Sequence, residues 1–207
     1  MILSDTDRAR IVEAIREAEQ RTSGEIYCAI TAASSSHRVF PLAWAAAIAL
    51  LVPLPLIYLT TWPALVIYTL QLAAFLGVLY LLTRRSVRYR IVPPTVKRAR
   101  AHQEALRQFT AHGLQHTEGR TGVLIFVSVA ERYAEILADA GIARKVPAKV
   151  WDDAVRVLIS GIAVGRAAEG FVAAIGQCAA VLAEHFPPGA INRNELPNAI
   201  IELSPLA

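Results

Sequence analysis

The pattern of apolar positions is dominated by residues 39–83, a run of 45 residues that contains no Asp, Glu, Lys or Arg. A helix of about 20 apolar residues crosses the hydrocarbon core of a bilayer, so the run holds two such lengths in tandem, residues 41–59 and 63–82. We predict a transmembrane helical hairpin over this run, kinked in its first span by Pro53 and Pro55. A helical hairpin buried in the core of a soluble domain is the alternative.

The remaining sequence has the pattern of a soluble α/β domain. Apolar residues recur with helical spacing in some segments and form short continuous runs in others. The predicted helices span residues 4–21, 95–113, 146–160 and 165–184, and the predicted strands span residues 25–32, 123–129 and 133–139. We therefore expect a discontinuous domain over residues 1–38 and 84–186, in which helices cover a small sheet, and a C-terminal tail over residues 187–207.

The positive charge of the chain is concentrated directly after the apolar run. Residues 84–100 contain seven Lys or Arg and no acidic residue, and without these seven the formal net charge falls from +4 to −3. The loop between the two spans has no basic residue, so the positive-inside rule places both termini and the soluble domain in the cytoplasm. The residues expected at the membrane surface, against anionic headgroups of the lipid bilayer, are Arg84, Arg85, Arg88 and Arg90. Nucleic acid is not expected as a partner, because this segment holds a single aromatic residue, Tyr89.

Histidine and cysteine residues are candidate metal ligands or nucleophiles, and the sequence favours neither role. His112 and His116 lie four residues apart with His102 upstream, and two histidines at this spacing can ligate zinc. The helix is expected to end between them, so we interpret these histidines as solvated. Cys28 and Cys178 have no evident histidine partner and are expected to be buried, unpaired residues in a reducing compartment.

Several short motifs occur in an order shared with a known family. They are Ser23-Gly24-Glu25-Ile26, Thr121-Gly122-Val123-Leu124-Ile125, Glu131-Arg132, Gly141-Ile142 with Pro147, and Gly165 with Gly170. The order and spacing of these motifs resemble the TPM domain family of thylakoid lumen phosphatase-like and photosystem repair proteins and their bacterial relatives. The resemblance covers residues 4–33 and 95–186. The resemblance implies a Rossmann-like α/β/α sandwich, acid phosphatase activity, divalent metal binding in some members and a role in maintaining membrane proteins.

Acidic residues near the ends of predicted strands are the candidate metal ligands. Asp139 ends a predicted strand, Glu131 lies in the loop before it, and Asp152 and Asp153 open a helix. Because ligands of open α/β sheets bind beyond the carboxyl ends of the strands, these carboxylates are expected to converge on a divalent cation, calcium or magnesium, and Arg132 to hold a phosphate. In the alternative, Asp152 and Asp153 only complement a helix N-terminus and Arg132 forms a surface ion pair.

Two hypotheses for the function follow. The first is a membrane-anchored TPM-like protein that acts as an interaction or maintenance module at the inner membrane, with membrane proteins as partners. The alternative is a metal-dependent acid phosphatase-like hydrolase with Asp139 and Arg132 as its catalytic residues. Many relatives have a glycine at the position of Asp139 and an acidic residue at the position of Ala143, and this departure favours the first hypothesis.

Overall fold

The computed structural model describes residues 2–35, 39–84, 87, 90–117, 119–188 and 195–203 of the 207-residue chain. The chain divides into two compact units. Residues 1–35 and 98–207 form the first, which we call the α/β unit, and residues 36–97 form the second, which we call the hairpin unit.

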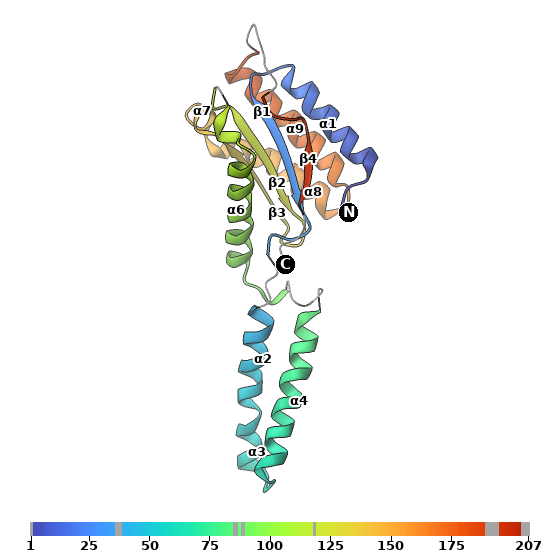
Figure 1. Ribbon diagram of the computed structural model, residues 1–207, viewed down its shortest axis with the longest axis vertical. Coiled ribbons are helices and arrows are strands. Elements are labelled where there is room, and N and C mark those ends of the chain that lie inside the picture. The colour runs from blue at the N-terminus through green and yellow to red at the C-terminus, as the bar shows by residue number, and fades with distance from the viewer. Residues whose placement is uncertain are drawn as a thin grey trace. The chain divides into compact units, whose positions relative to one another are not determined.

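A mixed sheet of four strands lies at the centre of the described part of the α/β unit (Figure 1). Its strands, in the spatial order β3-β2-β1-β4, are β3 (Tyr133–Ala138), β2 (Gly122–Ser128), β1 (Glu25–Thr31) and β4 (Ile200–Leu203). β1, β2 and β4 are parallel, whereas β3 runs antiparallel to β2. Every residue of β1 and β2 is buried, as expected of strands covered on both faces.

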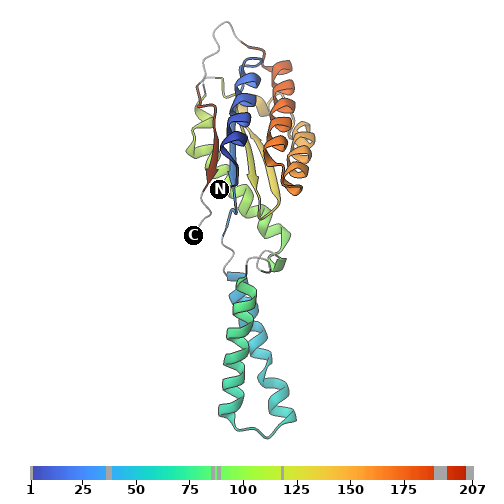
Figure 2. The same ribbon diagram turned by 90° about the vertical axis from the view of Figure 1, so that its right-hand side faces the viewer.

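Helices cover both faces of this sheet (Figure 2). One layer consists of α1 (Asp5–Glu19), α8 (Asp152–Ala163) and α9 (Ala167–His185), and the other of α6 (Pro94–Ala111) with a 3-10 turn at Leu114–His116. Side chains alternate along β1, so Ile26 and Cys28 pack against the first layer while Tyr27 and Ala29 pack against the second. The α/β class is therefore confirmed, with a sheet that is mixed rather than wholly parallel.

The chain between β3 and α8 is short and mostly helical. It forms α7 (Ala140–Ala143) and a 3-10 turn at Ala148–Trp151. Ile142 and Trp151 of this segment are buried in the core that α8 and α9 share with the sheet. At the opposite end of the chain, α1 begins at Asp5 because the Ser4 hydroxyl accepts the Asp7 N–H at 3.1 Å.

The expected C-terminal tail contains a strand that the sequence reading missed. β4 pairs in parallel with β1, from Cys28 opposite Ile200 to Thr31 opposite Leu203. Glu202 fixes this strand against the start of the chain, because its carboxylate accepts the Ile2 N–H at 2.6 Å and pairs with Arg8. Residues 189–194 and 204–207 of the predicted tail lie outside the described residues.

The hairpin unit contains the apolar helices α2 (Val39–Leu51), α3 (Pro53–Leu59) and α4 (Ala64–Thr83). The break before Pro53 agrees with the predicted kink, since proline removes a backbone donor from the helix. α2 packs against α4, and the side chains buried there include the small residues Ala45 and Ala49. Small residues at such an interface let two helix backbones approach closely.

Three helical segments in the described residues are long and apolar enough to cross a membrane, with no membrane present in the structure. Two lie in the hairpin unit, at Val39–Leu59 and Ala64–Thr83, and the third is α9. The hairpin segments expose most of their large apolar side chains, whereas α9 buries Phe171, Ile175 and Leu182 in the core of the α/β unit. The structure therefore contains the predicted pair of apolar helices and one further apolar helix of a different kind.

Candidate functional site

The turn between β2 and β3 carries Glu131 and Arg132, two of the residues singled out from the sequence. The end of β1 supports this turn, because the Val129 N–H donates to the Thr31 carbonyl and the Ala130 N–H to the Ala32 carbonyl, both at 3.0 Å. Arg132 closes the turn with φ of 50°, a left-handed backbone conformation that few residues other than glycine adopt. The turn thus lies at the edge of the sheet where β1 and β2 end.

Glu131 joins this turn to the segment that leaves β1. Its two carboxylate oxygens accept the Ser34 N–H at 3.3 Å and 3.2 Å, and the Ser128 hydroxyl donates to the same carboxylate. Ser34 and Ser128 are both buried. The carboxylate therefore acts as a structural acceptor that holds the end of β2 and the chain after β1 together, which we call the Glu131 clamp.

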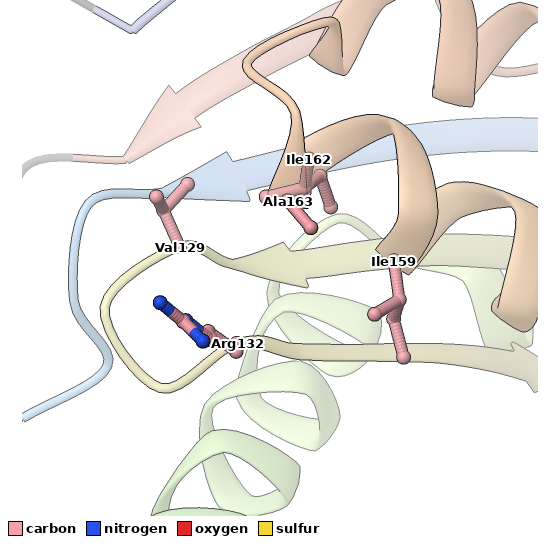
Figure 3. Close-up of a pocket in the computed structure, with 5 residues that line it drawn as sticks. All are labelled: Val129, Arg132, Ile159, Ile162 and Ala163. Carbon is pink, nitrogen blue, oxygen red and sulfur yellow. The ribbon is translucent and has the colours of Figure 1, made fainter.

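Arg132 lies at the rim of a pocket of about 290 Å³ (Figure 3). Val129 and Arg132 line it from the β2–β3 turn, and Ile159, Ile162 and Ala163 line it from the last turns of α8. The Arg132 side chain is exposed. Its guanidinium has no hydrogen bond or ion pair to any residue that the structure describes, so the predicted surface ion pair is not found. We call this feature the Arg132 pocket.

Asp139 lies at the other end of β3 and caps α7. Its Oδ1 accepts the Ala140 N–H at 2.6 Å, and its own N–H donates to the Gly122 carbonyl at 2.9 Å. Asp139 is 8% exposed, and its Oδ2 has no hydrogen-bond partner in the described part of the chain. One orphaned carboxylate oxygen is far short of the six to eight oxygens that Ca²⁺ takes.

Asp152 and Asp153 lie in the first turn of α8 and are exposed. Asp153 pairs with Arg156 one turn along the same helix. Acidic residues in a first turn stabilise a helix because they lie near its positive end. The positions of Asp152 and Asp153 agree with this alternative. Their helix carries Ala163 of the Arg132 pocket at its far end, about 15 Å along the axis.

The expectation that these carboxylates and Arg132 meet at one edge of the sheet is wrong. β3 is antiparallel to β2, so Ser128 faces Tyr133 at one edge and Val123 faces Ala138 at the other. Arg132 and Asp139 are therefore separated by the length of β3, about 20 Å at the usual rise per residue. No group of three or more His, Cys, Asp or Glu side chains within the described ranges is placed to hold a metal ion. The residues proposed for calcium or magnesium do not fit such an ion together.

The basic residues expected at a membrane surface are described in part. Arg84 follows the end of α4, donates to the Tyr80 hydroxyl and stacks over the Tyr80 ring at 4.7 Å. Arg90 is exposed, whereas Arg85 and Arg88 lie outside the described residues. The Tyr80–Arg84 pair joins an aromatic ring to a cation one helical turn further along the chain, a combination typical of a membrane interface.

His102, His112 and His116 are not gathered into a metal site. His112, directly after α6, stacks on Tyr27 of β1, and its Nδ1 lies 3.1 Å from the Tyr27 hydroxyl, so it is a hydrogen-bonded rather than a solvated residue. Burial lowers the pKa of His112. His102 instead lies 2.9 Å from the carboxylate of Glu135 on β3, and His116 contacts only Gln115 by a side-chain hydrogen bond in the described residues.

Two buried carboxylates near the start of β1 were not predicted as a pair. Glu19 accepts the Ile26 N–H at 3.0 Å, and Glu25 accepts the Leu196 N–H at 3.2 Å. Burial raises the pKa of Glu19 to about 7, with a smaller contribution from neighbouring Glu25, and burial likewise raises the pKa of Glu25. The sequence held a signal for Glu19, which lies four residues after buried Ile15 on the apolar face of α1.

The raised pKa of Glu19 predicts a specific dependence of stability on pH. Between about pH 4.5 and pH 7 the unfolded chain loses the Glu19 proton while the native state keeps it, so the free energy of unfolding falls as pH rises through this window. Glu19→Gln removes this loss and retains an acceptor for Ile26. We expect its melting temperature to exceed that of the native chain above pH 7 and to approach it near pH 4.5, as measured by calorimetry. Glu17→Gln, at an exposed position of α1, is the control, and a native-like pH profile for Glu19→Gln would contradict the assignment.

The isolated position of Asp139 predicts the response to divalent ions. Asn is as good an N-cap as Asp, so Asp139→Asn should fold normally, while Asp139→Ala should lose about 1 kcal/mol of stability with the cap. Millimolar Ca²⁺ or Mg²⁺ should leave the melting temperature of the native chain and of Asp139→Asn equally unchanged. A rise with Ca²⁺ in the native chain that Asp139→Asn lacks would place an ion at Asp139.

Comparison with known proteins connects this geometry to a family. The family model of the TPM domain matches residues 77–181, just over half of the chain. The match begins within α4 and ends within α9, so it includes both the Arg132 turn and the Asp139 cap. A search of curated proteins finds no match.

A solved structure supports the fold. The NMR structure of the BA42 protein from the psychrophilic bacterium Bizionia argentinensis is similar with a TM-score of 0.60 and 22% sequence identity, over 97% of this chain and 94% of that one. At this identity the likeness shows the fold alone. The family match is the stronger finding, and it confirms what the spaced motifs of the sequence indicate: this chain belongs to the TPM domain family.

Proposed function

We propose that this protein is a membrane-anchored TPM domain protein of the bacterial inner membrane. The hairpin unit crosses the bilayer twice, and both termini and the α/β unit lie in the cytoplasm. The α/β unit acts as an interaction or maintenance module for membrane proteins. The observation that carries the proposal is the outward-facing apolar surface of the hairpin helices.

That surface is apolar all round the helices. Leu50, Leu59 and Leu65 are 69%, 81% and 75% exposed, and Tyr58 is 86% exposed. Soluble proteins rarely leave apolar patches of this extent in water, whereas a bilayer accepts helices that are hydrophobic on every face. The two segments contain 21 and 20 residues, about 30 Å of helix each, which matches the hydrocarbon core.

The proposal uses two spans, although α9 is also long and apolar. Phe171, Ile175, Cys178 and Leu182 of α9 are buried against the sheet and its neighbouring helices. Moving α9 into lipid would uncover the core of the α/β unit. The orientation rests on charge: the loop between α3 and α4 has no charged residue, while seven basic residues follow α4.

A role as an interaction module is favoured over hydrolysis. A metal-assisted phosphatase that uses Asp139 and Arg132 would need both side chains around one phosphate. The reacting groups of such an enzyme lie within a few ångströms of each other. The length of β3 separates these two residues. The cysteines offer no nucleophile, because burial raises the pKa of Cys28 well above its usual value and that of Cys178 to about 12.

The topology predicts which engineered cysteines a membrane-impermeant maleimide reaches. Cys28 and Cys178 are buried, so the maleimide should not label the native chain. Thr61→Cys lies in the α3–α4 loop, and Glu17→Cys lies on the exposed face of α1. In intact spheroplasts we expect labelling of Thr61→Cys alone, with Glu17→Cys labelled only after lysis.

Alkaline carbonate extraction of the same membranes is the control for insertion. The chain should remain in the membrane pellet with its hairpin intact. Labelling of Glu17→Cys but not Thr61→Cys in intact spheroplasts would reverse the orientation, and release of the chain by carbonate would contradict membrane insertion.

A further inference from the structure

The Arg132 pocket combines a cation with apolar walls. Val129, Ile159, Ile162 and Ala163 provide an apolar lining, and the guanidinium of Arg132 lies beside them (Figure 3). A guanidinium is planar and matches phosphate oxygens in a bidentate manner. A ligand that suits both features has a phosphate next to an apolar portion.

The local charges leave Arg132 available for such a ligand. The carboxylate of its sequence neighbour Glu131 accepts hydrogen bonds from the Ser34 N–H and the Ser128 hydroxyl and is not paired with Arg132. Glu169, in the first turn of α9, pairs with Arg166 at 3.2 Å. Within the described part of the chain, the guanidinium of Arg132 meets no acceptor.

The turn also fixes the position of Arg132. Its N–H donates to the Val129 carbonyl at 3.1 Å, and the Glu131 clamp binds the turn to Ser34. A left-handed residue at φ of 50° is held only where the surrounding structure determines it. The cation is therefore presented from a fixed backbone rather than from a mobile loop.

Covalent connection limits how far the clamp can lie from the hairpin. Val39, the first residue of α2, is five positions after Ser34, which is at most about 19 Å of chain at 3.80 Å per Cα–Cα step. If α2 begins at the membrane surface, as the proposed function requires, the Glu131 clamp is tethered within reach of the lipid headgroups. An exposed apolar side chain, Val164 at 62% exposure, follows the pocket on the α8–α9 loop.

We propose that the Arg132 pocket binds the headgroup phosphate of an anionic phospholipid, with Arg132 on the phosphate and the α8 side chains against the adjoining apolar part of the lipid. This inference rests on the proposed membrane anchoring. It gives the α/β unit a lipid contact of its own, separate from the basic segment after α4. Lipid binding at this site holds the edge of the sheet that carries Arg132 on the membrane surface.

The test is native mass spectrometry of the full chain, delipidated in neutral detergent and titrated with phosphatidylglycerol, phosphatidylcholine or inorganic phosphate. Arg132→Asn removes the guanidinium with a residue that tolerates positive φ. Arg120→Asn is the matched control, since Arg120 is also exposed and also has φ of 50°, but lies in the turn before β2 at the opposite edge of the sheet. Ala163→Phe fills the pocket and leaves the charge in place.

We expect Arg132→Asn and Ala163→Phe each to weaken one phosphatidylglycerol site by at least about tenfold, the usual scale for losing a charge-assisted hydrogen bond, with Arg120→Asn unchanged. Native-like binding by Arg132→Asn would overturn the proposal and leave the basic segment as the lipid contact. Equal affinity for phosphatidylcholine, or for inorganic phosphate, would also overturn it.

This result can be separated from the topology test. Arg132→Asn should leave carbonate resistance and Thr61→Cys labelling unchanged, because the hairpin inserts without the pocket. Failure of the lipid titration with an intact topology contradicts the pocket alone. Release of the chain by carbonate contradicts the membrane anchor, whatever the result of the lipid titration.

Discussion

The connection between β2 and β3 contains only four residues, 129–132, and this shortness determines how the chemistry of the α/β unit is distributed. A parallel crossover needs about a dozen residues or more, so β3 has to return antiparallel to β2. Glu131 and Arg132 therefore lie at the edge where β1 and β2 end, and Asp139 lies at the edge where they begin. Groups that would have to cooperate on one phosphate or one metal ion are held apart by a strand.

Glu131 ties the same edge to the segment that follows β1. Its carboxylate accepts the Ser34 N–H, and Ser34 belongs to the short segment that leaves β1 for α2. The clamp therefore fixes the β2–β3 turn, and with it Arg132, to the end of β1.

Much of this fold is predictable from the sequence. The apolar run over residues 39–83, the break at Pro53 and the strands β1, β2 and β3 all follow from local patterns of residues. The direction of β3 was predictable too, because the two strand predictions leave room only for a tight turn between them. Because of this turn, Asp139 lies where β2 begins and not at the carboxyl edge of a parallel sheet.

Other features depend on contacts that no local pattern contains. β4 has four residues and follows a polar segment, so only its pairing with β1 identifies it as a strand. The Arg132 pocket joins a turn to the end of a helix about thirty residues later in the chain. Glu25 likewise accepts a hydrogen bond from Leu196, far along the chain. None of these contacts can be predicted from the spacing of residues in the sequence.

The central claim is that the edge carrying Arg132 faces the bilayer. Nitroxide labels at Ala163→Cys, in the Arg132 pocket, and at Arg120→Cys, in the turn before β2, measure this directly in nanodiscs that contain a nickel-chelating headgroup lipid. Both native cysteines are buried, so labelling is confined to the engineered sites. The account predicts that nickel enhances nitroxide relaxation more strongly at position 163 than at position 120. Equal enhancement at the two positions, or stronger enhancement at position 120, would contradict it.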